Sequence, residues 1–377
     1  MSEQVRPADP RGERLQCETD PGFTQWMSAC GGSLAISTYQ AGKLFLVGWN
    51  GQQISFLARD FDRPMGLDTQ GQRLALVTTN AVTVFANAPK LAPLYLEKDR
   101  YDALYLPRAM FVMPDLSIHD MAFAGDILWV VNTQCSCLAK LSLDQTFEPA
   151  WQPPFIDSLA AEDRCHLNGM AMVDGRPRYV TMLSRTNTKG GWREHKNDGG
   201  LVMDIDNNEV LLDGLAMPHS PRWHDGHLWV LNSGQGRLLR LDGKGGADVV
   251  CELQGYLRGL CFVNGYALIG LCKIRESNVF GGMPVQKRHP DLLCGIAIVS
   301  LRTGALVGML KLTSGCTEIY DIRFLPGVLR PNVVNLAMEE SRKGVDIPGL
   351  AVWLASDEKI RQMKEERADT AAAVKAR

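Results

Sequence analysis

Short runs of alternating apolar and polar residues recur along most of the chain, separated by turns rich in Gly, Asp and Asn. Two stretches align without a gap: HDMAFAGDILWVVNTQCSCLAKL from His119 and HSPRWHDGHLWVLNSGQGRLLRL from His219. Each reads as three short strands joined by two turns, because alternation with β-branched and aromatic residues is typical of half-buried strands. The pattern therefore predicts a repeated antiparallel unit.

Five further segments fit the same template. Most copies are followed by a hairpin with a polar turn, which supplies a fourth strand, and a spacing of about fifty residues is typical of propeller blades. The sequence therefore predicts an all-β fold, a single seven-bladed β-propeller, with a six-bladed ring as the alternative. The seven copies begin at Gln25, Arg63, His119, Asn168, His219, Arg258 and Tyr320.

The two ends of the repeat region complement each other. The last copy has a third strand, GLAVWLAS, but no fourth, whereas ERLQCETD before the first copy resembles the fourth strands elsewhere. We expect residues 13–18 to complete the last blade and close the ring, since closure removes exposed sheet edges. The expected division is a flexible N-terminus over 1–12, a propeller over 13–355 and a charged, helical or disordered tail over 356–377.

Composition excludes several classes of partner. A net charge of −2 argues against nonspecific nucleic-acid binding, which needs a positive field. No run of eighteen apolar residues occurs and the N-terminus has no apolar signal region, so neither a membrane span nor secretion is expected. The ten cysteines form no CxxC pair and fit reduced thiols in a cytoplasmic protein. A protein partner stays open.

The first residue of each copy is polar. The first strand of a propeller blade is innermost, so these seven positions are expected to form a ring around the central channel. Two Arg, two His and a Tyr are costly to crowd together, which favours a binding site over a merely solvated channel mouth. The residues predicted to bind a ligand are Gln25, Arg63, Asn168, Arg258 and Tyr320, with Arg222 close by.

The longest insertions are predicted to surround the mouth of this ring. They cover roughly residues 98–116, 184–199 and 272–293, at joints that lie on the face where the first strands begin. Two of them carry more basic than acidic residues. Together with the ring arginines, they indicate a small anionic ligand such as a carboxylate, phosphate or sulfate.

Three hypotheses for function stay open. In the first, which we favour, the protein is an enzyme in which His119 and His219 act as general base and acid and Asp120 orients a histidine. In the second, His119, His166 and His219 bind a divalent transition metal such as Fe, Mn, Zn or Cu. The sequence does not define the reaction class.

The third hypothesis is a propeller that binds or scaffolds partners without chemistry. Solvent-exposed aromatic residues on the long loops would favour it, and Trp192 and Phe280 are the candidates. Under this hypothesis the ring of polar residues would have no role of its own.

The repeat region resembles a bacterial family of conserved hypothetical proteins without an assigned activity. The segments HLNGMAM, MPHSPRWHDGHLWVLNSGQG and YDIRFLPGVLRP carry the resemblance, which covers roughly residues 20–355. It implies a propeller fold and no particular catalytic residues. The chain is also loosely similar to the lactonase and strictosidine-synthase propellers, whose lactonases bind axial calcium through acidic and amide ligands. Arg and His occupy most of the ring here, which argues against calcium-dependent lactone hydrolysis.

Overall fold

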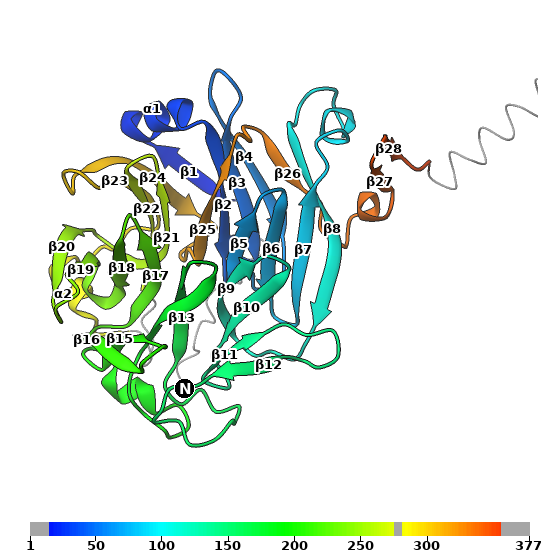
Figure 1. The fold of residues 1–377 in the computed structure, drawn as a ribbon. Helices are drawn as coiled ribbons and strands as arrows, with labels where there is room; N and C mark the ends of the chain where they lie inside the picture. Colours follow the sequence, from blue (N-terminus) through cyan, green and yellow to red (C-terminus); the bar gives the residue numbers. More distant parts are fainter. Residues whose placement is uncertain (1–14, 275–280, 356–377) are drawn as a thin grey trace, which may run out of the picture.

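The chain forms a ring of six antiparallel blades around a central axis (Figure 1). The computed structural model describes residues 15–274 and 281–355. In every blade one strand lies innermost and the next three follow outward. The innermost strands are β25 (Asp321–Pro326), β5 (Leu67–Gln70), β9 (Ile118–Ala124), β13 (Leu167–Val173), β17 (Pro218–His224) and β21 (Tyr256–Val263).

Three outer strands complete each blade. The first three blades use β2 (Gly32–Thr38), β3 (Lys43–Trp49) and β4 (Ile54–Asp60); β6 (Arg73–Thr78), β7 (Ala81–Asn87) and β8 (Ala103–Val112); and β10 (Ile127–Asn132), β11 (Cys137–Lys140) and β12 (Glu148–Trp151). The other three use β14 (Arg176–Met182), β15 (Gly200–Asp204) and β16 (Glu209–Leu215); β18 (His227–Asn232), β19 (Arg237–Leu241) and β20 (Ala247–Glu252); and β22 (Tyr266–Cys272), β23 (Gly295–Ser300) and β24 (Leu306–Ser314).

The prediction of seven blades is wrong, and the six-bladed alternative is confirmed. The copy that begins at Gln25 has no inner strand, because Pro21–Ala29 forms helix α1. Asp20 caps this helix by accepting a hydrogen bond from the backbone N–H of Phe23 at 2.7 Å, and the apolar residues at helical spacing pack into the core. The missing inner strand is β25, so the first and last copies form one blade.

Ring closure also differs from the prediction. The N-terminal strand β1 (Gln16–Thr19) does not supply a fourth strand: it pairs with β24 as a fifth strand at the outer edge of its blade. The ring is closed instead by β25, which pairs with β2 along six residues. A short strand, β26 (Pro331–Val333), then runs parallel to β8 at the edge of another blade.

The segment GLAVWLAS is not a third blade strand. Its residues Leu350–Trp353 form β28, which pairs only with β27 (Gly344–Ile347) in a separate hairpin. Figure 1 shows this hairpin beside β8, outside the ring. Trp353 packs against Tyr95, with ring centroids 5.5 Å apart, so the hairpin is attached through side-chain packing.

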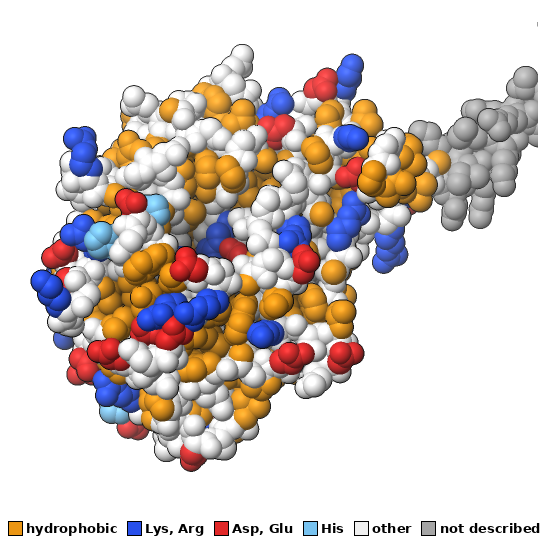
Figure 2. Space-filling view, viewed as in Figure 1, with side chains coloured by type: hydrophobic (Ala, Val, Ile, Leu, Met, Phe, Trp, Pro, Cys, Tyr) orange, Lys and Arg blue, Asp and Glu red, His pale blue; other side chains and the backbone are white. Residues whose placement is uncertain are grey.

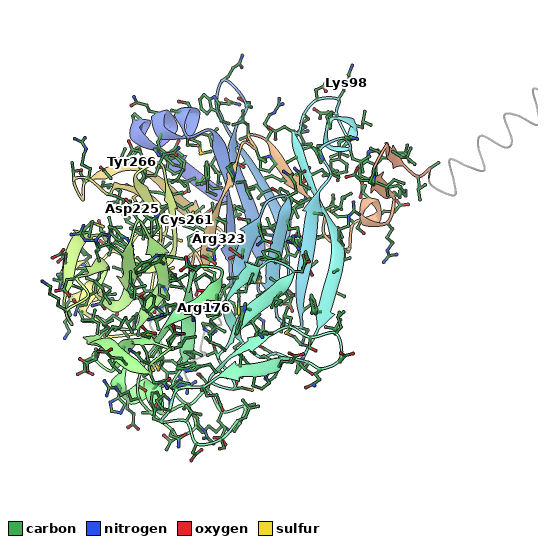
Figure 3. The ribbon with its side chains drawn as sticks, viewed as in Figure 1. Lys98, Arg176, Asp225, Cys261, Tyr266 and Arg323 are labelled. Carbon is green, nitrogen blue, oxygen red and sulfur yellow. The ribbon has the colours of Figure 1, made fainter. Side chains whose placement is uncertain are left out.

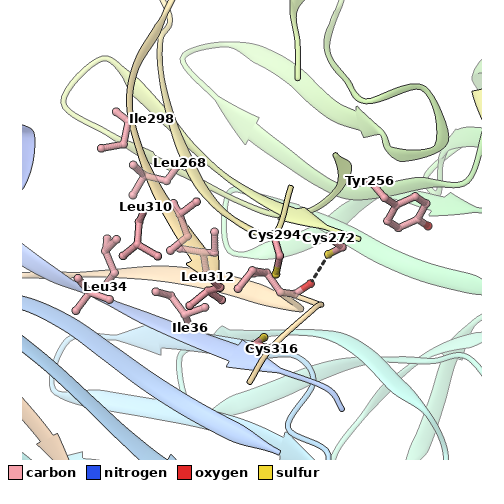
Figure 4. Packing of buried hydrophobic residues seen from close by; sticks show 14 of the residues in the cluster. Leu34, Ile36, Tyr256, Leu268, Cys272, Cys294, Ile298, Leu310, Leu312 and Cys316 are labelled. Atoms are coloured by element: carbon pink, nitrogen blue, oxygen red, sulfur yellow. Dashed lines mark hydrogen bonds between the residues drawn. The ribbon is translucent and has the colours of Figure 1, made fainter. Parts of the chain in front are cut away.

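The core lies between neighbouring blades. Every residue of β2 is buried, and Leu34 and Ile36 belong to one apolar cluster with Leu268, Ile298 and Leu310 of the adjoining blade (Figure 4). Burial of both faces accounts for the three consecutive apolar residues Leu34, Ala35 and Ile36 in this strand. All ten cysteines are free thiols, and seven of them are buried.

A repeated hydrogen bond joins three pairs of inner strands around the axis. A polar side chain on one strand accepts a backbone N–H from the next: Asp321 from Leu67 at 3.3 Å, Asp120 from Met170 at 3.1 Å and Ser220 from Gly259 at 3.0 Å. On the strands that donate these N–H groups, the position equivalent to the polar residue is a glycine, namely Gly66, Gly169 or Gly259, where an added Cβ would crowd the neighbouring blade. Polar residue and glycine thus alternate around the channel.

The remaining elements are short helices on the connections: α2 (Pro284–Arg288), η2 (Ala92–Leu94), η3 (Gly191–His195), η4 (Ser233–Gln235) and η5 (Glu339–Arg342). Within the described ranges, no helix is long and apolar enough to cross a membrane. The expected termini over 1–12 and 356–377 lie outside the described residues.

Candidate functional site

A cavity of about 340 Å³ opens where the inner strands begin. Four of the ring residues predicted from the sequence line it together: His119, His219, Arg258 and Tyr320. They come from three inner strands and from the residue that directly precedes β25. The fold therefore brings these four predicted residues to one site.

The blade that contains β5 contributes Met65, and not Arg63, to the layer formed by these four residues. The hairpin turns after Gln70 and Ala124 have the same length, and counting back five residues from each places Met65 level with His119. Met65 lines the cavity, whereas Arg63 lies outside its lining, where it contacts Thr79 and Tyr39.

A second layer of residues lies two positions earlier in the chain, nearer the mouth. This layer consists of Ser117, His166, Met217, Tyr256 and Glu318, and all five line the cavity. Three of them, Ser117, His166 and Met217, have left-handed backbone with φ of 49°, 51° and 49°. Such conformations are uncommon outside glycine and persist where the surrounding structure enforces them, as at binding sites.

His119 is anchored through Nδ1. This atom lies 2.7 Å from the carbonyl oxygen of Ser117 and 2.9 Å from the hydroxyl of Thr133, which itself donates to the carbonyl of Leu167. Both neighbours therefore accept, and Nδ1 carries the proton of the neutral ring. Nε2 is left as an acceptor, with no hydrogen-bond partner among the described residues.

His219 has the same arrangement. Its Nδ1 lies 2.9 Å from the carbonyl oxygen of Met217, with Ser233 and the hydroxyl of Tyr256 at 3.2 and 3.3 Å. A carbonyl only accepts, so Nδ1 is protonated in the neutral ring and Nε2 is the acceptor. Two blades thus present the same tautomer to the cavity.

Both imidazoles are held neutral near pH 7. Burial lowers the pKa of His119 well below its usual value, and electrostatic interactions with the neighbouring His166 and with the cation of Arg258 lower it further. The pKa of His219 is also well below its usual value, mainly because of burial and secondly because of the charge of Arg258. These two rings are therefore hydrogen-bond acceptors and not cations.

His166 forms a different unit with Asp163. Its Nδ1 lies 2.9 and 3.0 Å from the two carboxylate oxygens of Asp163, which also accepts from Nε1 of Trp192 at 2.8 Å. The ring of Trp192 packs on His166 with centroids 4.3 Å apart, and His119 meets His166 edge-on at 4.7 Å. A carboxylate on Nδ1 stabilises the imidazolium that forms when Nε2 accepts a proton.

Arg258 is the buried cation of the site. Its Nη1 donates to Glu318 at 2.8 Å, and its guanidinium carbon lies 3.7 Å from the ring centroid of Tyr320. The hydroxyl of Tyr320 is buried and has no hydrogen-bond partner within the described part of the chain. Such an unsatisfied group is uncommon and is often explained by function.

Three other predicted residues lie deeper in the channel or are used structurally. The amide of Asn168 is satisfied by Pro218 and Thr181. Asp120 does not contact an imidazole; it pairs with Arg222 at 2.8 Å, and both line a small pocket of about 10 Å³ below the main cavity. The carboxylate that orients a histidine is Asp163.

The pocket ends on a buried network of ion pairs. Arg222 also approaches Asp321, and Arg323 lies 2.7 Å from Asp321 and 3.0 Å from Asp68. Figure 3 labels Arg323 near the centre of the ring, and Figure 2 shows basic and acidic side chains together in the hollow there. The network closes the channel beneath the site.

Some predicted residues are not part of the site. Gln25 lies in α1, away from the cavity lining. Trp192 is buried and not solvent-exposed, so it no longer supports a scaffolding role, and Phe280 lies outside the described residues. Of the long insertions, 184–199 and the start of 272–293 reach the cavity, whereas 98–116 is mainly strand β8.

Sequence analysis missed Asp163, Tyr256 and Tyr39, which all line the cavity. Asp163 could have been suspected as a partner of His166 only because it lies three residues before that histidine in the sequence. For the metal hypothesis, no group of three or more His, Cys, Asp or Glu side chains within residues 15–274 and 281–355 is arranged to hold a metal ion. His119, His166 and His219 are near one another, but the cation of Arg258 lies beside them.

The fold and the cavity define a six-bladed propeller with a polar axial site. Residues 21–334 match the family described as "Domain of unknown function (DUF4915)". The chain belongs to this family, which confirms the predicted resemblance to a family without an assigned activity. No curated protein matches the sequence.

Solved structures with a similar fold are distant in sequence. A chain from a nidogen–laminin complex is 11% identical, with 79% of this chain and 99% of that chain covered and a TM-score of 0.52. A protein of unknown function from Bacteroides caccae is 10% identical (78% and 99% covered, TM-score 0.47), and a putative gluconolactonase is 12% identical (85% and 100% covered, TM-score 0.46). At such identities the similarity concerns the fold alone.

Proposed function

We propose that this propeller binds a small anionic molecule in its axial cavity and transfers a proton to or from it. The observation that carries the proposal is the grouping of a buried arginine, Arg258, with three imidazoles in one cavity of about 340 Å³. This volume suits a small metabolite. The neighbouring unsatisfied hydroxyl of Tyr320 supports the assignment.

Arg258 would bind the anionic group. A guanidinium keeps its charge in any protein environment and binds carboxylates with directed hydrogen bonds. Glu318 holds one of its nitrogens and fixes the direction of the side chain. The anion would therefore meet a cation that is already oriented before the ligand arrives.

His166 would act as the general base. In the proposed step, a bond between hydrogen and a substrate atom breaks, the proton binds Nε2 of His166, and the electron pair remains on the substrate. Asp163 favours this step because its carboxylate stabilises the positive ring. His119 and His219, predicted as base and acid, would instead stay neutral, since burial and the charge of Arg258 oppose their protonation.

Isothermal titration calorimetry tests the anion site by comparing the dissociation constants of phenylacetate and of its neutral amide. Phenylacetate should bind and the amide should not. Arg258→Met should weaken binding at least about tenfold, because a charged hydrogen bond contributes about 1.5–3 kcal/mol. Arg258→Lys tests whether charge alone suffices, and Arg240→Met, on the outer strand β19, is the control that should leave binding unchanged. Equal binding of acid and amide would overturn the anion site.

The catalytic part is tested separately by solvent exchange. Wild-type protein in D₂O should incorporate deuterium next to the carboxylate of bound phenylacetate, as followed by NMR. His166→Gln should bind the acid as wild type does but lose exchange, and Asp163→Asn should slow it by about 10²-fold or more. Binding without exchange in the wild type would leave a non-catalytic binding propeller.

A further inference from the structure

The hydrogen-bonding character of the cavity differs from one side to the other. Arg258 can only donate. His119 and His219 offer Nε2 atoms that only accept, because Nδ1 of each neutral ring is held by a backbone carbonyl. A ligand that satisfies both sides must carry an anionic acceptor group and at least one hydrogen-bond donor.

The charge of the lining residues limits the anion. Among the described residues that line the cavity, the cations are Arg193, Arg258 and Lys273, and the anions are Asp163 and Glu318. Three positive and two negative charges leave one positive charge while the histidines are neutral. A single negative charge on the ligand would balance this cavity.

The Nε2 atoms of His119 and His219 are fixed as hydrogen-bond acceptors. Backbone carbonyls two residues before each histidine fix the tautomer, and they do so in two separate blades. An imidazole acceptor buried without a donor loses hydrogen-bonding free energy, and a ligand hydroxyl would restore it. A ligand group that lacks a donor, such as a methyl or an aromatic edge, would leave these atoms unsatisfied.

Part of the remaining wall is apolar, although Gln40, Ser117 and Gln134 also line the cavity. Met65, Met217 and Ile274 line the cavity between the polar groups, together with the ring of Trp192. These surfaces suit a compact carbon skeleton.

From this arrangement we infer that the ligand is a monoanionic hydroxycarboxylate, with its carboxylate on Arg258 and a hydroxyl donating to Nε2 of His119 or His219. This inference rests on the proposed anion site and adds the hydroxyl to it. The orientation follows from the chemistry, because an ionised carboxylate has no hydrogen to donate to Nε2 of either histidine, whereas the hydroxyl has one.

The test compares acids that differ by one hydroxyl: glycolate with acetate, and mandelate with phenylacetate. In each pair, the hydroxy acid should bind wild-type protein at least about fivefold more tightly, as expected for one added buried hydrogen bond. The difference should shrink in His119→Phe or His219→Phe, which keep a ring but lose the acceptor. His227→Phe, an exposed residue at the far end of its blade, is the control and should keep the difference.

A second measurement does not depend on variants. In ¹⁵N NMR spectra of the wild type, the hydroxy acid should shift the Nε2 signal of His119 or His219, and the matched plain acid should not. If both acids of each pair bind equally and Arg258→Met weakens both, the hydroxycarboxylate inference is wrong and the anion site stands. If no acid binds, or if Arg258→Met has no effect on binding, the proposed function fails with it.

Discussion

Two tyrosines of the cavity differ in whether their hydroxyl groups have hydrogen-bond partners. Tyr320 and Tyr256 lie in adjacent layers, and burial raises the pKa of both phenols, so both are neutral hydroxyl groups at pH 7. The hydroxyl of Tyr256 contacts Nδ1 of His219, whereas that of Tyr320 has no partner among the described residues. The two tyrosines therefore allow a direct comparison between a buried hydroxyl that has a hydrogen-bond partner and one that has none.

Removal of each hydroxyl should have opposite effects. Tyr320→Phe should keep or raise the free energy of unfolding by about 1 kcal/mol, because it removes an unsatisfied buried polar group. Tyr256→Phe should lower it by about 1 kcal/mol, since a hydrogen bond is lost. Urea unfolding of the two variants and the wild type measures both changes. A loss in Tyr320→Phe equal to that in Tyr256→Phe would show that the Tyr320 hydroxyl is satisfied in the free protein.

The sequence predicted which residue types line the cavity better than it predicted how individual side chains are held there. The sequence identified His119, His219, Arg258 and Tyr320 from one repeated register, and the structure places them in one cavity. Asp163 could not be identified in the same way, because it lies before the repeat and reaches His166 only through a left-handed turn. Its role depends on backbone geometry that no repeat pattern contains.

At the scale of elements, three-stranded repeats were recognisable but their grouping into blades was not. Alternation identifies strands, and it marked most of those seen between β5 and β24. It could not show that α1 replaces an inner strand, since Phe23, Trp26 and Met27 are apolar in either reading. The pairing of β25 with β2 joins residues nearly three hundred positions apart and leaves no local pattern. The blade count failed for that reason.

Truncation distinguishes the closing strand from the appended hairpin. A chain that ends at residue 336 keeps β25 and β26 but lacks η5, the hairpin β27–β28 and residues 356–377. It should fold and melt about 5 °C lower, through lost packing that includes that of Trp353. A chain that ends at residue 319 lacks β25, exposes the edge of β2 and should not fold. Circular dichroism and gel filtration read out both results. Folding of the shorter chain would show that β25 is dispensable for the ring.

At the scale of the whole molecule, the channel is divided into the axial cavity and a closed floor. Around the floor, polar residues alternate with glycines from blade to blade, and two arginines neutralise the aspartates that point inward. A buried pair is strongly destabilised when one partner is removed, so the floor holds the six inner strands in a fixed arrangement. The cavity above it can then keep neutral imidazoles close to a cation.

This arrangement predicts how stability depends on pH. The folded-state pKa of His119 and of His219 lies below 6.5, so above pH 6.5 both states are neutral and neither histidine contributes. As the pH falls below 6.5, the two histidines become protonated in the unfolded chain but stay neutral in the folded protein. The free energy of unfolding therefore decreases until the folded-state pKa is reached. Between pH 7.5 and 5.5 the two histidines together should lower the free energy of unfolding by about 2–3 kcal/mol.

The double variant His119→Phe, His219→Phe isolates this effect. Its unfolding free energy, from urea titrations at each pH, should change less across that window than the wild-type value does. His227→Phe is the control and should keep the wild-type dependence, because this exposed residue lies outside the cavity. Arg258→Met should also reduce the slope, since loss of its charge lets the imidazoles accept protons more easily. An identical slope in the wild type and the double variant would mean that the cavity does not hold its histidines neutral, and the acceptor role proposed for them would fail.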